Sequence, residues 1–177
     1  MRKWRSAACL LFVLTASGTA SAQDHGPVGV TMAFPAAIGV IFHATDKVAV
    51  RPEFTFNHNS TELTTLDATS WSVGTGVSAL FYLRTQDRVQ TYISPRFSYT
   101  HAESNAVGTT AVPGSSSNGT GFSGSFGAQY SPSAKFSVFG EIGVGYTSSK
   151  NKSELTSSDL TSKSWGTRAG VGIVFYP

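Results

Sequence analysis

Five ionisable residues are the strongest candidates for chemistry in this 177-residue chain: Arg51, Glu53, Arg96, Glu141 and Arg168. Each lies in a segment where polar and apolar residues alternate, and each falls on the polar face. Guanidinium and carboxylate groups that face one another in a narrow space form strong, charge-assisted hydrogen bonds. The same groups could instead line a pore and make its constriction charge-selective. The sequence favours a structural network of paired charges, with Glu141 and Arg168 as the expected pair because they fall on adjacent strands.

A second group of residues with catalytic side chains is His58, Ser60 and Glu62. The members of a hydrolase triad are brought together by the fold from separate segments. Three residues so close in sequence do not generally converge in this way, and we interpret them as part of a polar loop. The remaining histidines lack metal-ligand spacing to one another or to acidic residues; they are His25, His43 and His101. We therefore expect no catalytic, cofactor or metal site, and no enzymatic activity.

The N-terminal 22 residues have the composition of a secretory signal peptide. They combine a basic start, an apolar stretch over residues 7–15 and an Ala-Ser-Ala cleavage site that ends at Ala22. Removal of this segment leaves residues 23–177 as one domain without Cys9, so neither a disulfide nor a cysteine metal site is expected. The segment also holds three of the 13 basic residues, against 10 acidic ones. The mature chain is then electrically balanced, which excludes a basic nucleic-acid-binding surface.

Apolar residues recur at every second position from residue 28 onward. In residues 47–57 the apolar face consists of Val48, Val50, Pro52, Phe54 and Phe56. A period of two is the signature of a β-strand, and a helix cannot produce it. The same alternation recurs along most of the chain, over residues 70–83, 89–100, 122–130, 136–146 and 165–175.

Short and long connections alternate between these segments. Residues 44–46, 84–88 and 131–133 are predicted to be tight turns, whereas residues 58–67, 102–118 and 149–160 are predicted to be long polar loops. Short turns on one rim and long loops on the other are typical of outer-membrane barrels.

The N-terminal alternation can be interpreted in two ways. Residues 28–34 and 38–42 are either the two strands of a hairpin around Pro35, which gives eight strands in total, or parts of one long bent strand, which gives seven. Bacterial single-chain barrels have even strand numbers, which favours eight. Inside two later strands, Pro52 and Pro95 each remove a donor from the ladder, and we expect a β-bulge at both.

The charges decide which face points outward. The apolar faces of the strands between residues 47 and 147 carry no Asp, Glu, Lys or Arg, and only 13% of the whole chain is charged, against about 25% in soluble domains. The sequence thus predicts an all-β, eight-stranded antiparallel transmembrane β-barrel with short periplasmic turns, longer extracellular loops and the charges inside. Aromatic residues near the strand ends fit an interfacial girdle; they are Trp71, Tyr99, Tyr130, Tyr146 and Trp165.

The C-terminal segment resembles the outer-membrane insertion signal, with a polar residue, Gly170 and then two hydrophobic residues, Ile173 and Phe175. With the signal peptide and the strand pattern, residues 28–176 resemble the small outer-membrane β-barrel family of the OmpA and OmpX type. One departure is that Pro177 follows the final aromatic residue. The resemblance implies location in a Gram-negative outer membrane, contact with its lipid and lipopolysaccharide, and recognition by the assembly machinery.

The function expected from these features is a non-enzymatic structural or surface role, with a lumen plugged by side chains and loops that contact external ligands. Alternatives are a small passive porin, a lipid-A-modifying enzyme and a soluble periplasmic lipid-binding barrel. No cofactor and no nucleic-acid partner is expected.

Overall fold

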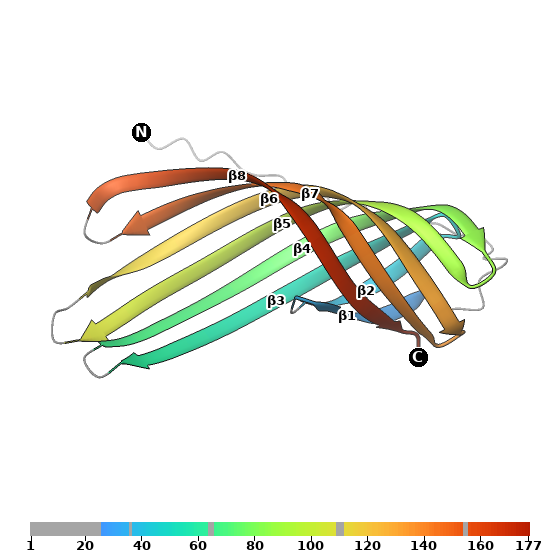
Figure 1. Ribbon diagram of the computed structural model, residues 1–177, viewed down its shortest axis with the longest axis horizontal. Coiled ribbons are helices and arrows are strands. Elements are labelled where there is room, and N and C mark those ends of the chain that lie inside the picture. Colours follow the sequence, from blue (N-terminus) through green and yellow to red (C-terminus); the bar gives the residue numbers. More distant parts are fainter. Residues whose placement is uncertain (1–25, 36, 64–65, 109–111, 154–155) are drawn as a thin grey trace, which may run out of the picture.

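The computed structural model describes residues 26–35, 37–63, 66–108, 112–153 and 156–177. Within these ranges no helix is long and apolar enough to cross a membrane. Eight strands pair antiparallel with their neighbours in sequence, and the last pairs with the first to close the ring (Figure 1). The strands are β1 (Val28–Phe34), β2 (Ala37–Thr45), β3 (Val48–Leu63), β4 (Leu66–Gln86), β5 (Val89–Gly108), β6 (Val112–Ser133), β7 (Phe136–Ser153) and β8 (Thr156–Phe175).

The predicted eight-stranded barrel is confirmed, including the hairpin around Pro35. β1 and β2 pair from Val28↔Phe42 to Ala33↔Ala37, so the single bent strand is excluded. The predicted signal peptide and its cysteine lie outside the described residues.

The apolar faces point outward, as the charge distribution predicts. On β7, for example, Ile142 is 67% exposed and Val144 is 59% exposed. Glu141, which directly precedes Ile142 and faces the other side of the sheet, is 5% exposed. The exposed hydrophobic residues lie on the outer faces of all eight strands. The molecule therefore shows an apolar belt to its surroundings and encloses the charged residues Arg51, Glu53 and Glu141.

The strand register fixes the tilt of the barrel. If one starts at Ile173 on β8 and moves from each residue to its backbone partner on the next strand, one returns to β8 at Lys163, ten residues away. The intermediate partners are Met32, Ile38, Phe54, Thr75, Tyr99, Thr120 and Ser148. A closed barrel with such a stagger has strands inclined at about 35–45° to its axis.

The expected bulges at the two prolines are absent. Pro52 pairs with Val77 and Pro95 with Gly124, both in continuous register. On the other side of each proline the register resumes unchanged after a short interruption of the ladder. Proline lacks only its own N–H, so the ladder loses a bond without needing an extra residue. The register shifts between described strands lie elsewhere, for example between Tyr82 and Arg84.

The three predicted long loops are also wrong, because most of their residues continue the strands. β3 and β4 stay paired up to Leu63↔Leu66, β5 and β6 up to Ala106↔Val112, and β7 and β8 up to Ser153↔Thr156. Only residues 64–65, 109–111 and 154–155 separate these strands. A polar composition suggested loops, but Thr favours strands and a hairpin above the membrane needs no apolar face.

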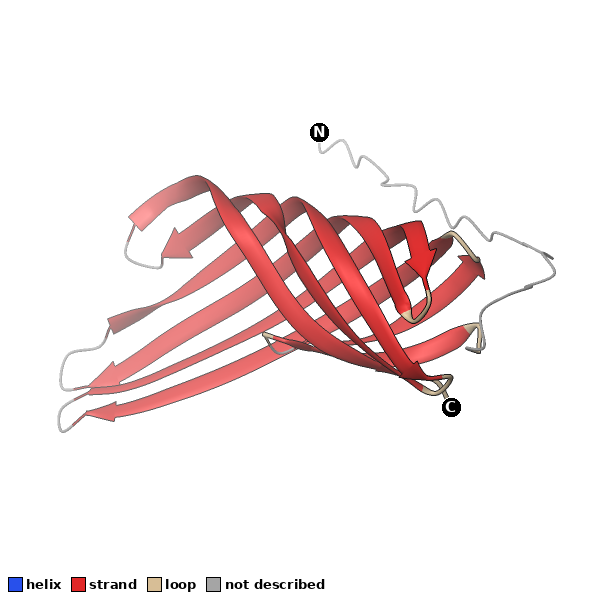
Figure 2. Ribbon diagram, turned by 45° about the vertical axis from the view of Figure 1, so that its right-hand side comes forward, coloured by secondary structure: helices blue, strands red, loops and turns tan. Residues whose placement is uncertain are grey.

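The barrel wall has unequal height. β1 and β2 have seven and nine residues, whereas the other strands have 16 to 22. Pairing of β1 with β8 ends at Phe34↔Val171, and pairing of β2 with β3 ends at Ile38↔Phe54. The ring is thus closed near the short turns, which we call the inner rim. Toward the opposite end, the outer rim, β3 and β8 become the two edges of an open, curved sheet (Figure 2).

Candidate functional site

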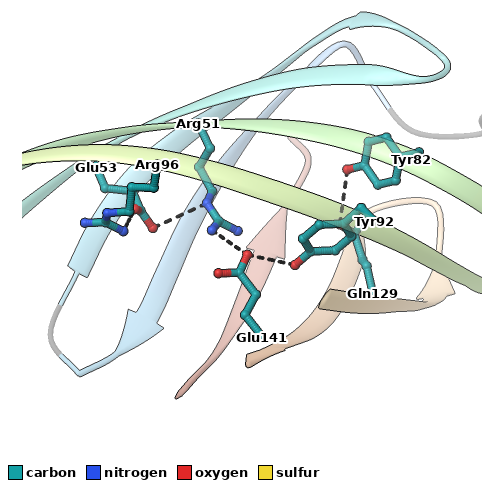
Figure 3. A network of polar contacts seen from close by, with 7 residues as sticks. All are labelled: Arg51, Glu53, Tyr82, Tyr92, Arg96, Gln129 and Glu141. Carbon is teal, nitrogen blue, oxygen red and sulfur yellow. Dashed lines mark hydrogen bonds and ion pairs between the residues drawn. The ribbon is translucent and has the colours of Figure 1, made fainter. Parts of the chain in front are cut away.

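Four of the five predicted charged residues meet inside the barrel (Figure 3). Arg51 on β3 donates from Nη2 to Oε1 of Glu141 on β7, at 2.6 Å across the lumen. Its Nε lies 3.3 Å from Oε1 of Glu53. Glu53 in turn accepts a hydrogen bond from Arg96 on β5. The result is a continuous chain of alternating charges, Arg96–Glu53–Arg51–Glu141, which we call the lumen network.

The lumen network satisfies an electrostatic requirement. Arg51, Glu53 and Glu141 are each at most 7% exposed. Isolated charges cannot stay buried in this way, and each must be paired and hydrogen-bonded. Because the two carboxylates alternate with the two guanidinium groups, the buried charges compensate one another.

Aromatic side chains that were not among the predicted site residues complete the network. The hydroxyl of Tyr92 on β5 donates to Oε1 of Glu141 at 2.9 Å. The guanidinium of Arg51 also lies over the ring of Phe139, 4.7 Å from its centroid, in cation–π geometry. Both aromatic residues occupy inward positions of their strands, so the alternation itself was the signal that could have identified them.

Arg168 does not join the network, and the expected pair with Glu141 does not form. On β8 the backbone partner of Glu141 is Gly170, and Arg168 lies opposite Gly143. The Glu141 carboxylate crosses the lumen to Arg51 instead of following its own wall. Within the described residues Arg168 has no carboxylate within ion-pair distance. Adjacency of strands was thus a poor guide, because long side chains in a narrow barrel reach the opposite wall.

Two glycines make room for the large side chains. A Cβ on Gly76 would lie 2.7 Å from Nη2 of Arg96. A Cβ on Gly127 would overlap the ring of Tyr92. These glycines are therefore cradles for the side chains of the network.

Between the network and the inner rim, the lumen is filled by apolar and aromatic side chains. Tyr82 stacks on the ring of His43, with centroids 5.8 Å apart. The Nε2 atom of His43 lies 2.9 Å from the hydroxyl of Tyr176. Other buried residues of this cluster are Ile41, Ala49, Leu80, Tyr92, Phe139 and Val174. The buried side chains of the lumen thus form two successive layers, one charged and one mostly apolar.

On the outer side of the lumen network, the inner face of the extended sheet forms a polar cavity of about 380 Å³. Neutral hydroxyl and amide side chains dominate its lining, which includes Asn57, Asn59, Ser70, Ser72, Ser104, Ser115, Ser117 and Asn151. We call this cavity the vestibule. Its lining also includes Trp71, Ala102 and Glu103, and it can hydrogen-bond polar groups.

Toward the outer rim, the apolar belt ends at an aromatic girdle that consists of Trp71, Tyr99, Tyr146 and Trp165. Tyr130, also predicted in a girdle, lies near the inner rim, where it pairs with Val89. Next to it, His101 on β5 contacts the Trp71 ring, with centroids 5.4 Å apart. The Nδ1 atom of His101 lies 2.8 Å from Oδ1 of Asn118, and Nε2 lies 3.3 Å from a Glu103 oxygen. These hydrogen bonds, first to Asn118 and then to Glu103, raise the pKa of His101 above its ordinary value of 6.5.

The remaining candidates take part in no such cluster. His58 and Ser60 are exposed, two positions apart on β3, in a strand rather than the predicted loop. Ile173 and Phe175 of the insertion signal point outward on β8, and Gly170 lies opposite Glu141. Among the residues with described positions, no group of three or more His, Cys, Asp or Glu could hold a metal ion.

Comparison with known proteins gives a likeness of structure only. No protein-family model and no curated protein matches the sequence. A major outer membrane protein of Thermus thermophilus superposes with a TM-score of 0.57 at 12% identity, over 84% of this chain and 97% of that chain. The chain has the fold of an outer-membrane β-barrel.

Two further solved barrels superpose less closely on this fold. CarO of Acinetobacter baumannii has a TM-score of 0.45 at 12% identity, over 89% of this chain and 100% of that chain. The attachment invasion locus protein Ail of Yersinia pestis has a TM-score of 0.44 at 13% identity, over 84% of this chain and 93% of that chain.

Proposed function

We propose that this chain is a non-enzymatic, integral outer-membrane protein with a plugged lumen and a structural or surface role. The observation that carries the proposal is the lumen network, Arg96–Glu53–Arg51–Glu141, which joins β3, β5 and β7 across the interior. An eight-stranded barrel is just wide enough for side chains to fill. Charges that neutralise one another in this space stabilise the wall, and the side chains that carry them would obstruct the passage of ions.

The apolar belt supports the membrane assignment. Outward-facing residues such as Ile142, Phe122 and Phe54 are at least 50% exposed. In water such a continuous apolar surface would aggregate, whereas in a bilayer it faces hydrocarbon. Outer-membrane lipid and lipopolysaccharide are therefore the first partners of the proposal, and the outward-facing C-terminal residues would be read by the assembly machinery.

The outer rim supports a surface role. Strands β3 to β8 carry Ser-, Thr- and Asn-rich segments past the aromatic girdle. Figure 1 shows these strands extending beyond the short β1 and β2. Paired strands present a more rigid surface than loops do, because each backbone group along the ladder is fixed by its neighbour. This rim is where contact with external ligands is proposed.

Planar-bilayer recording tests the plugged lumen. The purified protein is inserted at low density, and gel mobility before and after boiling verifies that it is folded. We expect no steady current above that of the bilayer alone. A steady, voltage-independent current from folded protein would overturn the plugged lumen and identify a passive porin.

Mass spectrometry of lipid A tests the absence of enzymatic activity. Lipid A is compared between cells with and without the protein, and no change of mass is expected. A new acylation or deacylation product that depends on the protein would contradict the proposal. Fractionation is the companion measurement, and recovery of the protein in solution without detergent would contradict its membrane location.

A further inference from the structure

Because β1 and β2 are shorter than the other strands, the wall has a side opening, which we call the outer notch. It is bounded by the part of β3 that lies between Phe54 and the outer rim and by the part of β8 that lies between Val171 and the outer rim. Among the described residues, β3 from Thr55 and β8 up to Gly170 have pairing partners on one side only. Trp165 of the aromatic girdle lies farther along β8 toward the outer rim and is 77% exposed. The lower part of the notch is therefore beneath the girdle and faces the outer half of the hydrocarbon layer.

Free strand edges at this depth require a polar partner. In hydrocarbon each unsatisfied backbone group costs several kcal/mol, and irregular edges are tolerated only where they line a water-filled cavity. The vestibule supplies such a cavity, because two of its lining residues, Asn57 and Asn59, belong to the β3 edge of the notch. The notch thus connects a polar chamber with the lipid phase.

Arg168 gives the notch a positive charge. It lies on an inward position of β8, two residues from Gly170, on the strand that forms one edge of the notch. The inward-facing ions of the membrane span comprise Arg51, Arg96 and Arg168 against Glu53 and Glu141. Both carboxylates are used by Arg51 and Arg96, so Arg168 is the cation in excess within the described residues. A guanidinium near hydrocarbon is costly unless an anion or water pairs with it.

Directly below the notch, the lipid-facing wall carries an apolar groove of about 400 Å³. Phe34 at the tip of β1 forms one side, and Gly140 leaves space in the wall because a Cβ there would meet no atom closer than 4.0 Å. Further lining residues include Phe126, Ala128, Ile142, Ala169 and Val171, together with Glu141, whose side chain is buried in the lumen network. The groove is at the lower end of the size range of small-molecule sites, which suits one acyl chain rather than several.

We propose that the outer notch binds a single-chain fatty acid from the outer half of the bilayer. The carboxylate pairs with the Arg168 guanidinium, whose planar fork matches two carboxylate oxygens. The chain descends along Phe34 into the apolar groove, toward the middle of the membrane. Head and tail thus have the orientation of a lipid in the outer leaflet. The proposal rests on the membrane orientation of the proposed function and adds a ligand to it.

Photocrosslinking in phosphatidylcholine vesicles tests this proposal. The probe is a palmitic acid with a diazirine in its chain, and mass spectrometry maps the labelled peptides. We expect labelling concentrated on the peptides with Phe34, Ile142 and Val171. Replacement Arg168→Gln should reduce it about tenfold, the ratio typical of a lost charge-assisted bond. A fatty alcohol with the same diazirine should label all variants equally and weakly.

Matched variants separate the site from general lipid contact. Gly140→Leu fills the groove and should abolish the concentrated labelling, whereas Gly124→Leu adds the same side chain to open outer wall on β6 and should not. Arg84→Gln removes an exposed cation near the inner rim and should also leave labelling unchanged.

Each remaining outcome contradicts the fatty-acid site. Equal labelling of wild type and Arg168→Gln, or equal labelling by acid and alcohol, would mean ordinary contact with surrounding lipid. Suppression of labelling by added lipid A but not by unlabelled palmitate would assign the notch to a different lipid. Gel mobility before boiling shows separately whether each variant is a folded barrel, so failure of the membrane assignment is distinguishable from failure of this site.

Discussion

At the scale of single residues, the lumen depends on the match between large side chains and small ones. Tyr92 reaches Glu141 only because the facing position on β6 is Gly127. The same principle places Gly76 against the Arg96 guanidinium. Protein interiors are close-packed, so even one added methyl group destabilises the fold when the neighbouring side chains cannot move away. Burial of the network makes such movement difficult.

Replacement Gly127→Ala tests this packing. The new methyl group would overlap the Tyr92 ring, and overpacking of this kind costs about 1–3 kcal/mol. We expect a lower urea midpoint of unfolding in lipid vesicles, measured by gel mobility of unboiled samples. Gly124→Ala is the matched control three residues earlier on β6, because its Cβ would meet nothing within 4 Å. An equal effect of both substitutions would contradict the role of Gly127 as a cradle.

The His101 cluster gives a residue-scale prediction about pH. Hydrogen bonds to Asn118 and then to Glu103 raise the pKa of His101 above 6.5. Because the folded pKa exceeds that of the unfolded chain, the protonated ring stabilises the folded state below about pH 6.5. This contribution is lost as the pH rises through the raised folded pKa.

An NMR titration of the His101 ring measures this effect. The midpoint should lie above 6.5 in the folded barrel, and Asn118→Ala should lower it. Ser116→Ala, two positions away on β6, is the control and should leave the midpoint in place. A wild-type midpoint at or below 6.5 would show that the two hydrogen bonds do not favour the charged ring.

At the scale of elements, the parts of β3 to β8 that lie beyond the aromatic girdle are paired strands. The apolar belt does not stabilise these parts. β5 and β6 pair in the belt at Phe97↔Phe122 and continue past the girdle at Ala102↔Ser117. Only the part below the girdle has an outward apolar face. The strand extensions are therefore held by hairpin pairing with their neighbours, whereas the belt is held by the membrane and by ring closure.

Shortening one hairpin tests this division. Replacement of residues 103–116 by an Asn-Gly turn joins β5 to β6 above the girdle, at a position where the two strands are already paired. We expect the shortened chain to form a heat-modifiable barrel with the same mobility shift. A matched deletion of residues 97–122, which removes wall within the belt, should abolish it. Failure of the first deletion to fold would mean that the extension helps to close the barrel.

At the scale of the whole molecule, ring closure and stagger determine shape. The displacement of ten residues around the ring, from Ile173 to Lys163, inclines every strand. Inclination carries the free edge of β8 obliquely through the outer half of the belt, and the short β1–β2 hairpin does not cover it. The outer notch is thus a property of the whole barrel rather than of one strand.

Polarised infrared spectroscopy of oriented bilayers measures the inclination. The amide bands should report strands tilted by about 35–45° from the membrane normal. Binding of palmitate should leave this angle unchanged, because the notch lies beside the ladder and not within it. A tilt near zero would contradict the observed strand register.

Much of the fold follows from alternation along the sequence, because a period of two assigns each residue to one face whatever its neighbours are. The strands were predictable for this reason, whereas the lack of charge on their apolar faces predicted the apolar exterior, and the even strand numbers of bacterial barrels favoured eight. Pro52 and Pro95 show the limit of such local reasoning. Each removes one donor, but whether a bulge forms depends on the partner strand.

What only the tertiary structure decided is which side chains meet. Alternation placed Glu141 and Arg168 on neighbouring walls, yet Glu141 pairs with Arg51 across the lumen, because partners in a closed barrel depend on register and stagger. The tertiary structure also decided where each strand ends. Polar residues after Asn57 carry no local signal that separates a loop from a paired strand, and what decides between them is the pairing with the neighbouring strand β4.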